Sequence, residues 1–408
     1  MSRDCEFLVV GAGITGLTIA RELLSRGADS ISIVDKEAAS GAHASGRNSG
    51  VIHAGIYYSP GTLKARYCSE GGRRMKQFCR DSGVIFHETG KVIVAVNQGQ
   101  LSALDELKVR ADACGADASV IDPSELARLE PHAATYERAL YSPATAVVDP
   151  KEVLRALERE LEGSGKVTMS YGTQVSGPAG DRKLQTSQGV IGFDRLVNAA
   201  GSFADKIAHR FGVAREYRIL PFKGTYRKLA KSRASLVRGS VYPVPDLQNP
   251  FLGAHFTRGV SGDVYVGPTA IPAFGRENYG AFDGWTWEAP SILVRDAVLL
   301  MRNAAFRTAA LTEPRKYWKR VLFNEARALI PGLRLDDLEA TDKVGIRPQL
   351  VHWPTKKLVM DFVTHREQGV LHVLNAISPA FTSSMAFAHH AVDLLFEKAQ
   401  GAPHAVSV

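Results

Sequence analysis

The stretch Phe7-Leu-Val-Val-Gly-Ala-Gly-Ile-Thr-Gly16 stands near the beginning of the 408-residue chain and decides the fold. Its apolar part, residues 7–10, predicts a buried parallel strand because no polar residue interrupts it. Residues 17–25 have helical spacing that ends at Gly27, and residues 31–34 predict a second strand. Strand, tight turn, helix and strand make a βαβ unit, which predicts an α/β fold with a parallel sheet.

Three glycines in the turn, Gly11, Gly13 and Gly16, satisfy the pattern G-x-G-x-x-G. The first permits the turn, the second lets backbone N–H groups approach a pyrophosphate, and the third lets the helix pack closely on the strand. Glycine is common, so the pattern alone is weak. Its position between strand and helix, with Asp35 about 20 residues further on, favours a dinucleotide site in which Asp35 binds the adenosine ribose. The alternative is a structural turn that binds no ligand.

The loop at residues 40–50, SGAHASGRNSG, distinguishes between the two common dinucleotides. An NAD-binding chain would continue into further βα units, whereas this small, polar loop offers backbone donors to an extended ligand such as FAD. A low-complexity stretch is the alternative, although a strand and a helix flank the loop. The expected cofactor contacts in this part of the chain are Gly11, Gly13, Ile14, Thr15, Gly16, Asp35, Lys36, Ala44, Ser45, Asn48, Ser49 and Gly50.

Composition narrows the class of protein. The length predicts two domains, and 45% hydrophobic with 23% charged residues is typical of a globular protein. The formal charge of +8 favours anionic ligands or an anionic surface. Nucleic acid is not expected as a partner, because no zinc-type spacing, lysine-rich tail or recognition motif is present. Four scattered cysteines without a Cys-x-x-Cys pair indicate reduced thiols, and we expect a cytoplasmic protein.

No apolar run approaches the roughly 20 residues of a transmembrane helix, and the short run near the N-terminus lacks a signal-peptide cleavage pattern. Further strands are expected at residues 91–96, 195–199, 264–266 and 370–374, and helices at 101–114, 151–161 and 384–397. No clear linker divides the chain into two consecutive domains, which favours discontinuous domains. We expect one domain, which binds the cofactor, at 1–85, 145–215 and 340–408, and a substrate domain at 86–144 and 216–339.

Several longer motifs carry a resemblance to a known family. They are RNSGVIHAGIYY at 47–58, GKVIVAV at 90–96, PFKG at 221–224, VYPVPD at 241–246, PFLGAHFT at 250–257 and NAISPAFTSS at 375–384. With them the chain resembles, over nearly its whole length, the FAD-dependent L-2-hydroxyglutarate dehydrogenase/oxidase family of the D-amino-acid-oxidase-like superfamily. Gly345-Ile-Arg-Pro348 has the superfamily's Gly-x-Arg-Pro form in a local context that departs from this family, which leaves the role of Arg347 open.

The resemblance implies an α/β fold with a Rossmann-type FAD-binding domain and a discontinuous mixed-sheet substrate domain. It also implies oxidation of L-2-hydroxyglutarate to 2-oxoglutarate by hydride transfer to FAD. An amino-acid or secondary-amine oxidase of the same fold is the alternative within this class. A flavin-binding or membrane-docking protein without catalytic activity is the alternative from another class.

Oxidation of a hydroxy acid needs C2 facing the flavin, a base for the hydroxyl proton and cations for the carboxylates. His53 and His255 are the candidate bases, with His255 preferred on superfamily geometry; either histidine could instead be a hydrogen-bonded core residue. Arg347 could hold a carboxylate with two hydrogen bonds, or could be a solvated or ion-paired arginine. Further possible donors to a carboxylate are Tyr57, Tyr58 and Tyr242, although such tyrosines are more often core residues.

The resemblance implies two more flavin-binding segments. Asn198-Ala-Ala-Gly201 follows a strand and is similar to the superfamily's second flavin turn, with Val175 as a backbone contact. Ser378-Pro-Ala-Phe-Thr382 should begin the last long helix, whose N–H groups would stabilise negative charge on the reduced flavin. The expected contacts there are Val175, Ala199, Ala200, Gly201, Pro379, Ala380, Thr382 and Ser383. No metal ligands are expected.

Residues 283–330 mix aromatic and basic side chains at helical spacing. Such a stretch can lie on an anionic membrane surface, which would place the protein peripherally on the inner membrane and near a quinone acceptor. The side chains expected to reach the membrane are Trp287, Phe306 and Trp318, with Arg315, Lys316, Lys319 and Arg320 binding the headgroups. The alternative is an ordinary pair of amphipathic helices in the substrate domain.

Overall fold

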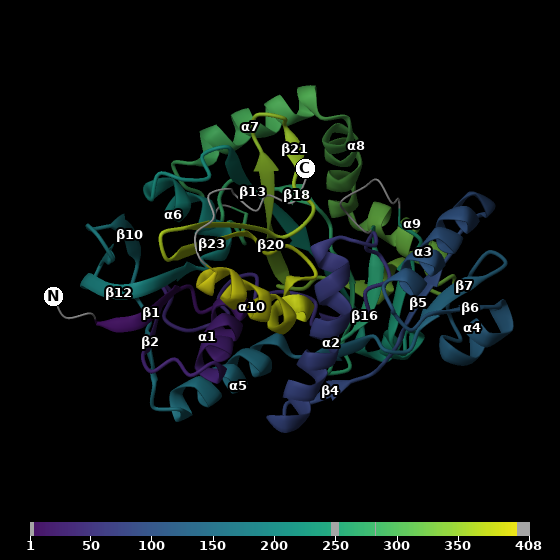
Figure 1. The fold of residues 1–408 in the computed structure, drawn as a ribbon. Helices are drawn as coiled ribbons and strands as arrows, with labels where there is room; N and C mark the ends of the chain where they lie inside the picture. The colour runs from purple at the N-terminus through teal and green to yellow at the C-terminus, as the bar shows by residue number, and fades with distance from the viewer. Residues whose placement is uncertain (1–3, 246–252, 282, 398–408) are drawn as a thin grey trace.

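The computed structural model describes residues 4–245, 253–281 and 283–397 (Figure 1). The N-terminal βαβ unit forms as predicted, with β1 (Cys5–Val10), α1 (Ile14–Ser25) and β2 (Ile31–Val34). β1 and β2 pair in parallel from Phe7 opposite Ile31 to Val10 opposite Val34. Because helices and neighbouring strands cover β1 on both faces, Phe7, Leu8 and Val9 are almost completely buried.

The first sheet continues this unit. Its strand order is β10-β11-β12-β1-β2-β9, with β23 paired to β12 and β22 paired to β23. Parallel pairing along β23-β12-β1-β2-β9 and antiparallel pairing of the outer strands make it a mixed sheet. The added strands are β9 (Val167–Ser170), β10 (Val175–Pro178), β11 (Lys183–Thr186), β12 (Gly189–Asn198), β22 (Val363–Glu367) and β23 (Val370–Asn375).

Helices α2 (Leu63–Asp81), α5 (Pro150–Gly163) and α10 (Ala380–Phe396) pack around α1. Figure 1 shows α10 between α1 and α2. The sequence analysis predicted the helices at 151–161 and 384–397 but not α2. The close approach of α2 to α10 depends on Gly71, where a Cβ would stand 2.5 Å from the Thr382 carbonyl oxygen.

The second sheet has the order β19-β14-β17-β16-β15-β5-β7-β6. Its pairs are antiparallel except for β15 with β5. The strands are β5 (Lys91–Val94), β6 (Ser119–Ile121), β7 (Ala139–Ser142), β14 (Arg227–Leu229), β15 (Ser240–Pro243), β16 (His255–Arg258), β17 (Val264–Gly267) and β19 (Leu338–Glu339). The predicted strand at 91–96 therefore ends at Val94. Asp246 and residues 250–252 of the quoted motifs lie outside the described residues.

Two smaller sheets complete the strands. β13 (Tyr217–Thr225) and β20 (Val344–His352) pair along their whole length between β18 (Ile271–Pro272) and β21 (Lys357–Leu358). β3 (Val51–Ile52), β8 (Ala146–Val148) and β4 (Phe86–His87) form the other. The β13–β20 pair joins a segment expected in the substrate domain to one expected in the FAD domain. The two expected domains are therefore joined by the backbone hydrogen bonds of the β13–β20 pair.

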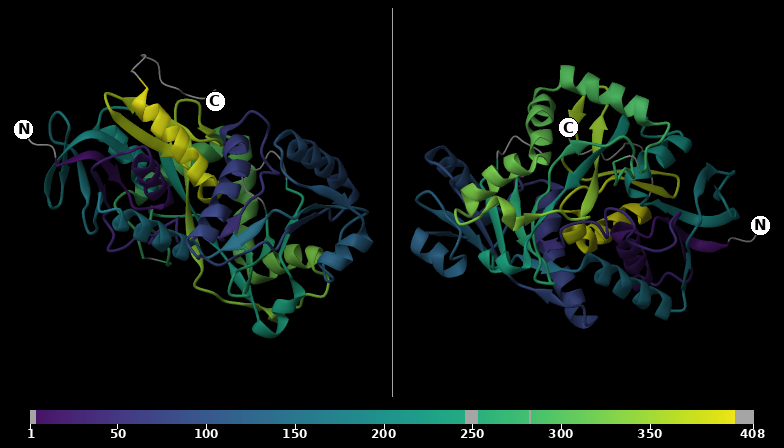
Figure 2. Two further views of the ribbon diagram at one scale, coloured as in Figure 1. Left: turned by 60° about the horizontal axis from the view of Figure 1, so that its bottom comes forward. Right: turned by 180° about the vertical axis from the view of Figure 1, so that it is seen from behind.

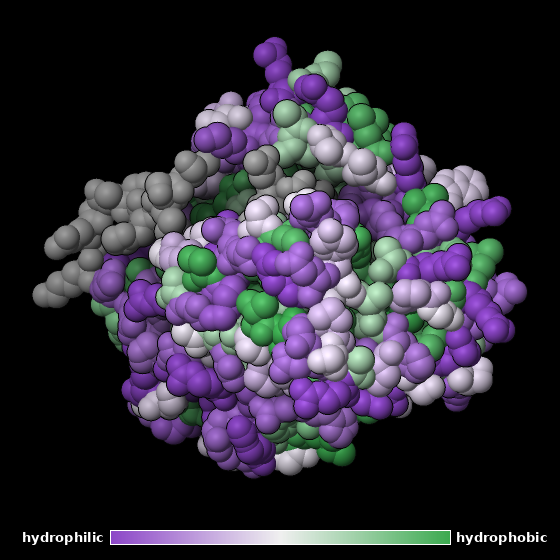
Figure 3. All heavy atoms as spheres, turned by 90° about the vertical axis from the view of Figure 1, so that its right-hand side faces the viewer, coloured by the Kyte–Doolittle hydropathy of each residue, from purple (hydrophilic) through white to green (hydrophobic). Residues whose placement is uncertain are grey.

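The remaining helices lie mainly around the second sheet and along one edge of the molecule (Figure 2). They are α3 (Leu101–Ala113), α4 (Pro123–Leu129), α6 (Ala204–Arg210), α7 (Ala289–Arg302), α8 (Ala304–Thr312) and α9 (Lys319–Leu329). On the side where α3 and α4 lie, hydrophobic residues are scattered among hydrophilic ones (Figure 3). Within the described ranges, no helix combines the length and apolar character that a membrane crossing needs.

The 283–330 stretch departs from two expectations. Phe306 is buried and packs against Phe222 with ring centroids 5.9 Å apart, so the prediction that it reaches a membrane is wrong. Lys316 is also buried and pairs with Glu313 at 2.7 Å, so it is not a surface cation for headgroups. Both errors arise because α8 and the turn after it fold back onto the β13 sheet, which periodicity alone does not reveal. Trp287 and Trp318 are strongly exposed, as expected.

Candidate active site

A cavity of about 780 Å³ extends from the glycine turn after β1 to the β15–β16 strands and α10. It brings together most of the predicted site residues: Gly11, Gly13, Ile14, Thr15, Asp35, Lys36, Ala44, Ser45, Asn48, Ser49, His53, Val175, Ala199, Ala200, Gly201, Tyr242, His255, Arg347, Pro379, Ala380 and Thr382. Five predicted residues, Gly16, Gly50, Tyr57, Tyr58 and Ser383, are not part of its lining. Gly50 instead allows a close approach to β8, where a Cβ would lie 2.2 Å from the Val148 carbonyl oxygen.

The glycine turn has the geometry that a dinucleotide requires. Gly11 has a φ of +108°, and a Cβ there would stand 2.5 Å from the Ala199 carbonyl oxygen. At Gly16 a Cβ would meet the Gly11 carbonyl oxygen at 1.9 Å, so this glycine serves the packing of helix on turn. Gly13 has an ordinary φ of −80° and faces the cavity, where a side chain would take ligand space. The turn fits a pyrophosphate laid across it.

The beginning of α1 is suited to negative charge. Gly13 is the N-cap residue of α1 and has no side chain that could accept a hydrogen bond from the first turn. No acidic residue lies in that turn. The Ile14 N–H donates to Ser45 Oγ at 2.9 Å, which fixes the polar loop against the helix end. Free N–H groups and the helix dipole both favour an anion at this point.

Asp35 is held at the end of β2. Its Oδ2 accepts from the Ala12 N–H at 2.7 Å, and its Oδ1 accepts from the Glu37 N–H at 2.9 Å. Each carboxylate oxygen retains a lone pair, and the residue lines the cavity. This arrangement suits the predicted hydrogen bonds to ribose hydroxyls.

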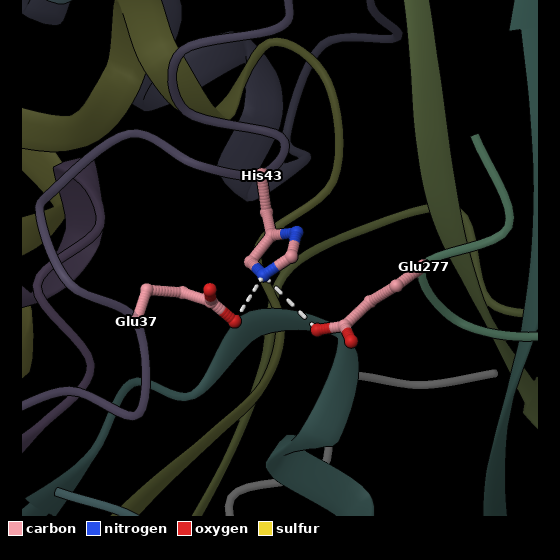
Figure 4. A group of neighbouring side chains, drawn as sticks. All are labelled: Glu37, His43 and Glu277. Atoms are coloured by element: carbon pink, nitrogen blue, oxygen red, sulfur yellow. Dashed lines mark hydrogen bonds and ion pairs between the residues drawn. The ribbon is translucent and has the colours of Figure 1, made fainter. Parts of the chain in front are cut away.

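An ion-pair network that no sequence motif predicts lies beside Asp35 (Figure 4). His43 Nε2 lies 2.9 Å from Glu37 Oε1 and 3.0 Å from Glu277 Oε1. Lys36 Nζ contacts both carboxylates. Burial alone would raise the pKa of Glu277, but hydrogen bonds from His43 and Lys36 outweigh it and lower the pKa to about 2. The ligand types would suit a divalent cation, yet the Lys36 ammonium already supplies the positive charge.

The same network holds residues 276–279 over the polar loop. Tyr279 Oη lies 2.8 Å from His43 Nδ1, and its ring lies 4.1 Å from the Arg47 guanidinium. Arg276 makes a buried ion pair with Asp205 at 2.5 Å. The partners in these contacts are separated by 71 to 236 residues, so no local pattern could have shown them.

His255 and His53 both line the other end of the cavity. The His255 Nδ1 lies 3.0 Å from the Gly253 carbonyl oxygen, which can only accept, so Nδ1 carries the proton and Nε2 keeps its lone pair. The His255 ring stacks on Tyr242 with centroids 3.9 Å apart. The His53 backbone N–H donates to Thr382 Oγ1 at 3.1 Å, which ties it to α10.

Burial and nearby positive charge keep both imidazoles neutral. Burial chiefly lowers the pKa of His255 to about 4, with a further contribution from Lys91. Burial and Lys91 together lower the pKa of His53 to about 3. A neutral imidazole with an accessible lone pair can accept a proton at neutral pH.

Two of the cations in the cavity wall, Arg347 and Lys223, lie on the paired strands β20 and β13. Arg347 lies on β20 directly opposite Phe222 of β13, and although burial lowers its pKa to about 10, it stays charged at neutral pH. Lys223 donates to the Gly280 carbonyl oxygen at 2.6 Å. Lys223 is not among the site residues predicted from the sequence, although its place in the PFKG motif at 221–224 was a signal for it. Tyr58 is not part of the lining, and its ring lies 5.8 Å from Lys64 Nζ.

The beginning of α10 also faces the cavity, as predicted. The helix starts at Ala380 after Pro379, without a side-chain cap or an acidic residue in its first turn. Residues 376–382 line the cavity. The positive end of this helix dipole can therefore stabilise negative charge inside the site.

The model of the FAD dependent oxidoreductase family matches residues 6–394. The chain belongs to this family. FAD is accordingly its cofactor, and the glycine turn, Asp35 and the 40–50 loop are where the cavity fits it. The protein is an FAD-dependent oxidoreductase with the D-amino-acid-oxidase-like fold that the sequence analysis predicted.

Close relatives narrow the family further. The chain is 35% identical to the mitochondrial L-2-hydroxyglutarate dehydrogenase of Caenorhabditis elegans, covering 94% of this chain and 91% of the relative. It is 32% identical to L-2-hydroxyglutarate dehydrogenase of Escherichia coli K12, covering 95% and 92%. Among solved structures, FAD-bound L-alpha-glycerophosphate oxidase from Mycoplasma pneumoniae aligns with a TM-score of 0.75 at 21% identity over 98% and 96% of the two chains. That likeness shows the shared fold.

Proposed function

We propose that the protein oxidises L-2-hydroxyglutarate to 2-oxoglutarate. The observation that carries the proposal is the arrangement of a neutral histidine and two cations in the cavity that fits FAD. Relatives covering more than nine-tenths of this chain bear the name of that activity. A substrate with two carboxylates needs two positively charged or strongly donating groups, and Arg347 and Lys223 line the same cavity.

Each side chain has a role in this proposal. Arg347 binds one carboxylate and orients C2, while Lys223 attracts the other. His255 accepts the hydroxyl proton at Nε2, because its Nδ1 is committed to Gly253. FAD, when bound, accepts the hydride from C2. Residues 276–279 and the 40–50 loop help to cover the cofactor and exclude water.

Anaerobic flavin reduction tests the substrate. The L isomer of 2-hydroxyglutarate should bleach the flavin absorption, and the D isomer should not, because fixed carboxylate sites present only one C2 hydrogen. Glycine and L-proline in the same panel test for an amino-acid or secondary-amine oxidase. Equal reduction by both isomers, or reduction by the amino acids alone, would contradict the proposal.

A second proposal concerns the electron acceptor: we propose that α7, α8 and the following turn dock on the anionic inner-membrane surface and that the electrons pass to a quinone. The supporting observation is a group of strongly exposed apolar side chains on this edge: Trp287, Val294, Met301, Leu311, Tyr317 and Trp318. Arg302, Arg315 and Arg320 are exposed near them in the sequence. Aromatic and basic groups together favour the interface of an anionic bilayer.

Sedimentation with phosphatidylglycerol-containing liposomes tests the docking surface. Binding should be strong at low salt and weaken at high salt, because screening reduces the attraction of each basic residue, worth about 1 kcal/mol. Reversing Arg315, Lys319 and Arg320 to Glu should release the protein without changing flavin reduction. Reversing three exposed basic residues on α2, α4 and α5, Arg73, Arg128 and Lys151, is the matched control and should leave binding nearly intact.

A further inference from the structure

Lys91, the first residue of β5, is a buried cation outside the cavity lining that has no role in the proposed chemistry. Lys91 is only 1% exposed, and its Nζ has no hydrogen-bond partner among the described residues. No carboxylate of the described chain forms an ion pair with it. Burying an ammonium without a counter-ion is costly, and a methionine would fill the same space at lower cost. A role beyond packing is therefore needed to explain it.

The surroundings of Lys91 connect it to the histidines. Its Nζ lies 4.5 Å from the ring centroid of Tyr57 and 5.1 Å from that of Tyr242. Tyr242 in turn stacks on His255 at 3.9 Å. The aromatic faces partly replace the hydration of the ammonium, so the charge is held in a low-dielectric layer directly behind the base.

Strand register fixes this arrangement. Ile93 of β5 lies beside Tyr242 of β15, and Lys91 is two residues before Ile93 on the same strand. Residues two apart point to the same face of a sheet, so Lys91 shares the face that carries Tyr242. The opposite face, with Val92 and Val241, packs in the core with α9.

We infer that Lys91 is a positioning residue for the proton transfer, whose buried positive charge holds His255 and His53 in the unprotonated form while a dianionic substrate is bound. The inference rests on the proposed function. Two substrate carboxylates would draw a proton onto a neighbouring imidazole, and a protonated histidine could no longer act as the base. A fixed cation behind Tyr242 opposes that proton uptake.

The other charges around the histidines have the same sign. Lys91 and Lys316 both lower the pKa of His255, and Lys91 and His255 both lower that of His53. Cys68 of α2 is the titratable group that acts most on Lys91 besides burial, and burial raises the pKa of that thiol to about 12, so it brings no negative charge at neutral pH. Burial lowers the pKa of Lys91 to about 8, which leaves the ammonium mostly charged at pH 7.

The test compares Lys91→Met and Lys91→Arg as FAD-loaded enzymes. The rate of anaerobic flavin reduction by L-2-hydroxyglutarate is measured against pH. In Lys91→Met the acid limb should move to higher pH by about one unit or more, the usual effect of one close charge. Lys91→Arg keeps the charge and should keep the wild-type limb. Lys76→Met is the control, because Lys76 is also buried but pairs with Glu88 at 2.7 Å, away from the cavity lining.

A second readout needs no substrate. In holoenzyme labelled with ¹³C at histidine Cε1, the His255 resonance, assigned through His255→Gln, should titrate at higher pH in Lys91→Met than in the wild type. Lys91→Gln replaces Lys91→Met if the latter retains no FAD. An unchanged acid limb and an unchanged histidine titration in an FAD-loaded variant would overturn the inference. If the wild type is not reduced by L-2-hydroxyglutarate, the proposed function fails, and the titration still decides the effect of Lys91.

Discussion

The two ends of the cavity are built in different ways. At the cofactor end, Gly11 and Gly13 lie in the turn after β1, Gly16 lies at the start of α1, and Asp35 directly follows β2. At the substrate end, His53, Tyr242, His255 and Arg347 come from three strands and one loop spread over 295 residues, and Lys91 lies behind Tyr242 on a fourth strand. A site formed by the backbone of one short segment can be recognised from a local sequence motif. A site formed by side chains from several strands depends on which strands become neighbours in the fold.

The charges differ in the same way. Near the cofactor end, Lys36 pairs with Glu277, and Arg276 pairs with Asp205, so the segments are tied together by compensated ions. At the substrate end, Lys223 donates to a backbone carbonyl, and Lys91 Nζ lies near the rings of Tyr57 and Tyr242 without a hydrogen-bond partner among the described residues. Lys223 lines the cavity, so its charge is available to an anionic ligand, whereas the buried Lys91 acts on the site only through its electrostatic field.

The largest expected effect is the loss of FAD binding after a substitution at the cofactor end of the cavity. Gly13→Val should abolish FAD binding: the φ of −80° is open to any residue, but a Cβ would stand 3.0 Å from Ser45 Oγ and the side chain would take the pyrophosphate space. Flavin absorption of the purified protein measures it. Gly163→Ala, where a Cβ would meet nothing within 4 Å, is the control and should keep full occupancy. Full occupancy of Gly13→Val would mean that the phosphates lie elsewhere.

An intermediate effect is expected at the substrate end. His255→Ala should slow flavin reduction by roughly 10²–10⁴-fold with FAD still bound, which is the usual contribution of a general base. His53→Ala should mainly perturb the flavin spectrum or occupancy, because His53 is tied to Thr382 at the start of α10. Stopped-flow reduction and absorption spectra separate the two variants. An exchange of the two phenotypes would make His53 the base.

The smallest effect concerns stability against acid. Burial chiefly lowers the pKa of His255 to about 4 and those of His53 and His372 to about 3. Between the ordinary pKa near 6.5 and these values the unfolded chain binds more protons, so the free energy of unfolding should fall as the pH falls. Each histidine contributes a slope of up to about 1.4 kcal/mol per pH unit.

Urea unfolding between pH 7 and pH 4.5 measures this slope. His372→Asn should lower the slope by up to the contribution of one titrating histidine. His372 suits this test because it is buried beside Asn198, away from the cavity lining. The exposed His87, changed to Gln, is the matched control and should leave the slope as it is. A stability that does not depend on pH over this range would show that the buried histidines take up protons as freely as in the unfolded chain.

The sequence by itself determined the cofactor end. Glycine at three fixed offsets after an apolar strand, a following helix and Asp35 specify one backbone shape, since the required torsion angles and close approaches exclude side chains. The resemblance to a known family also identified the two histidines and Arg347 as candidate site residues, because each lies within a short continuous motif of the chain. Helical periodicity also located α3, α5 and α10 to within a few residues of their observed ends.

Only the tertiary structure decided the rest. Phe306 and Lys316 have the same local periodicity as their exposed neighbours, and they are buried because α8 and the turn after it pack on the β13 sheet. The pairing of Glu277 with Lys36 and His43, and the place of Lys91 behind Tyr242, depend on contacts between residues more than a hundred positions apart. Burial and strand register act over such distances, and a local sequence pattern carries neither.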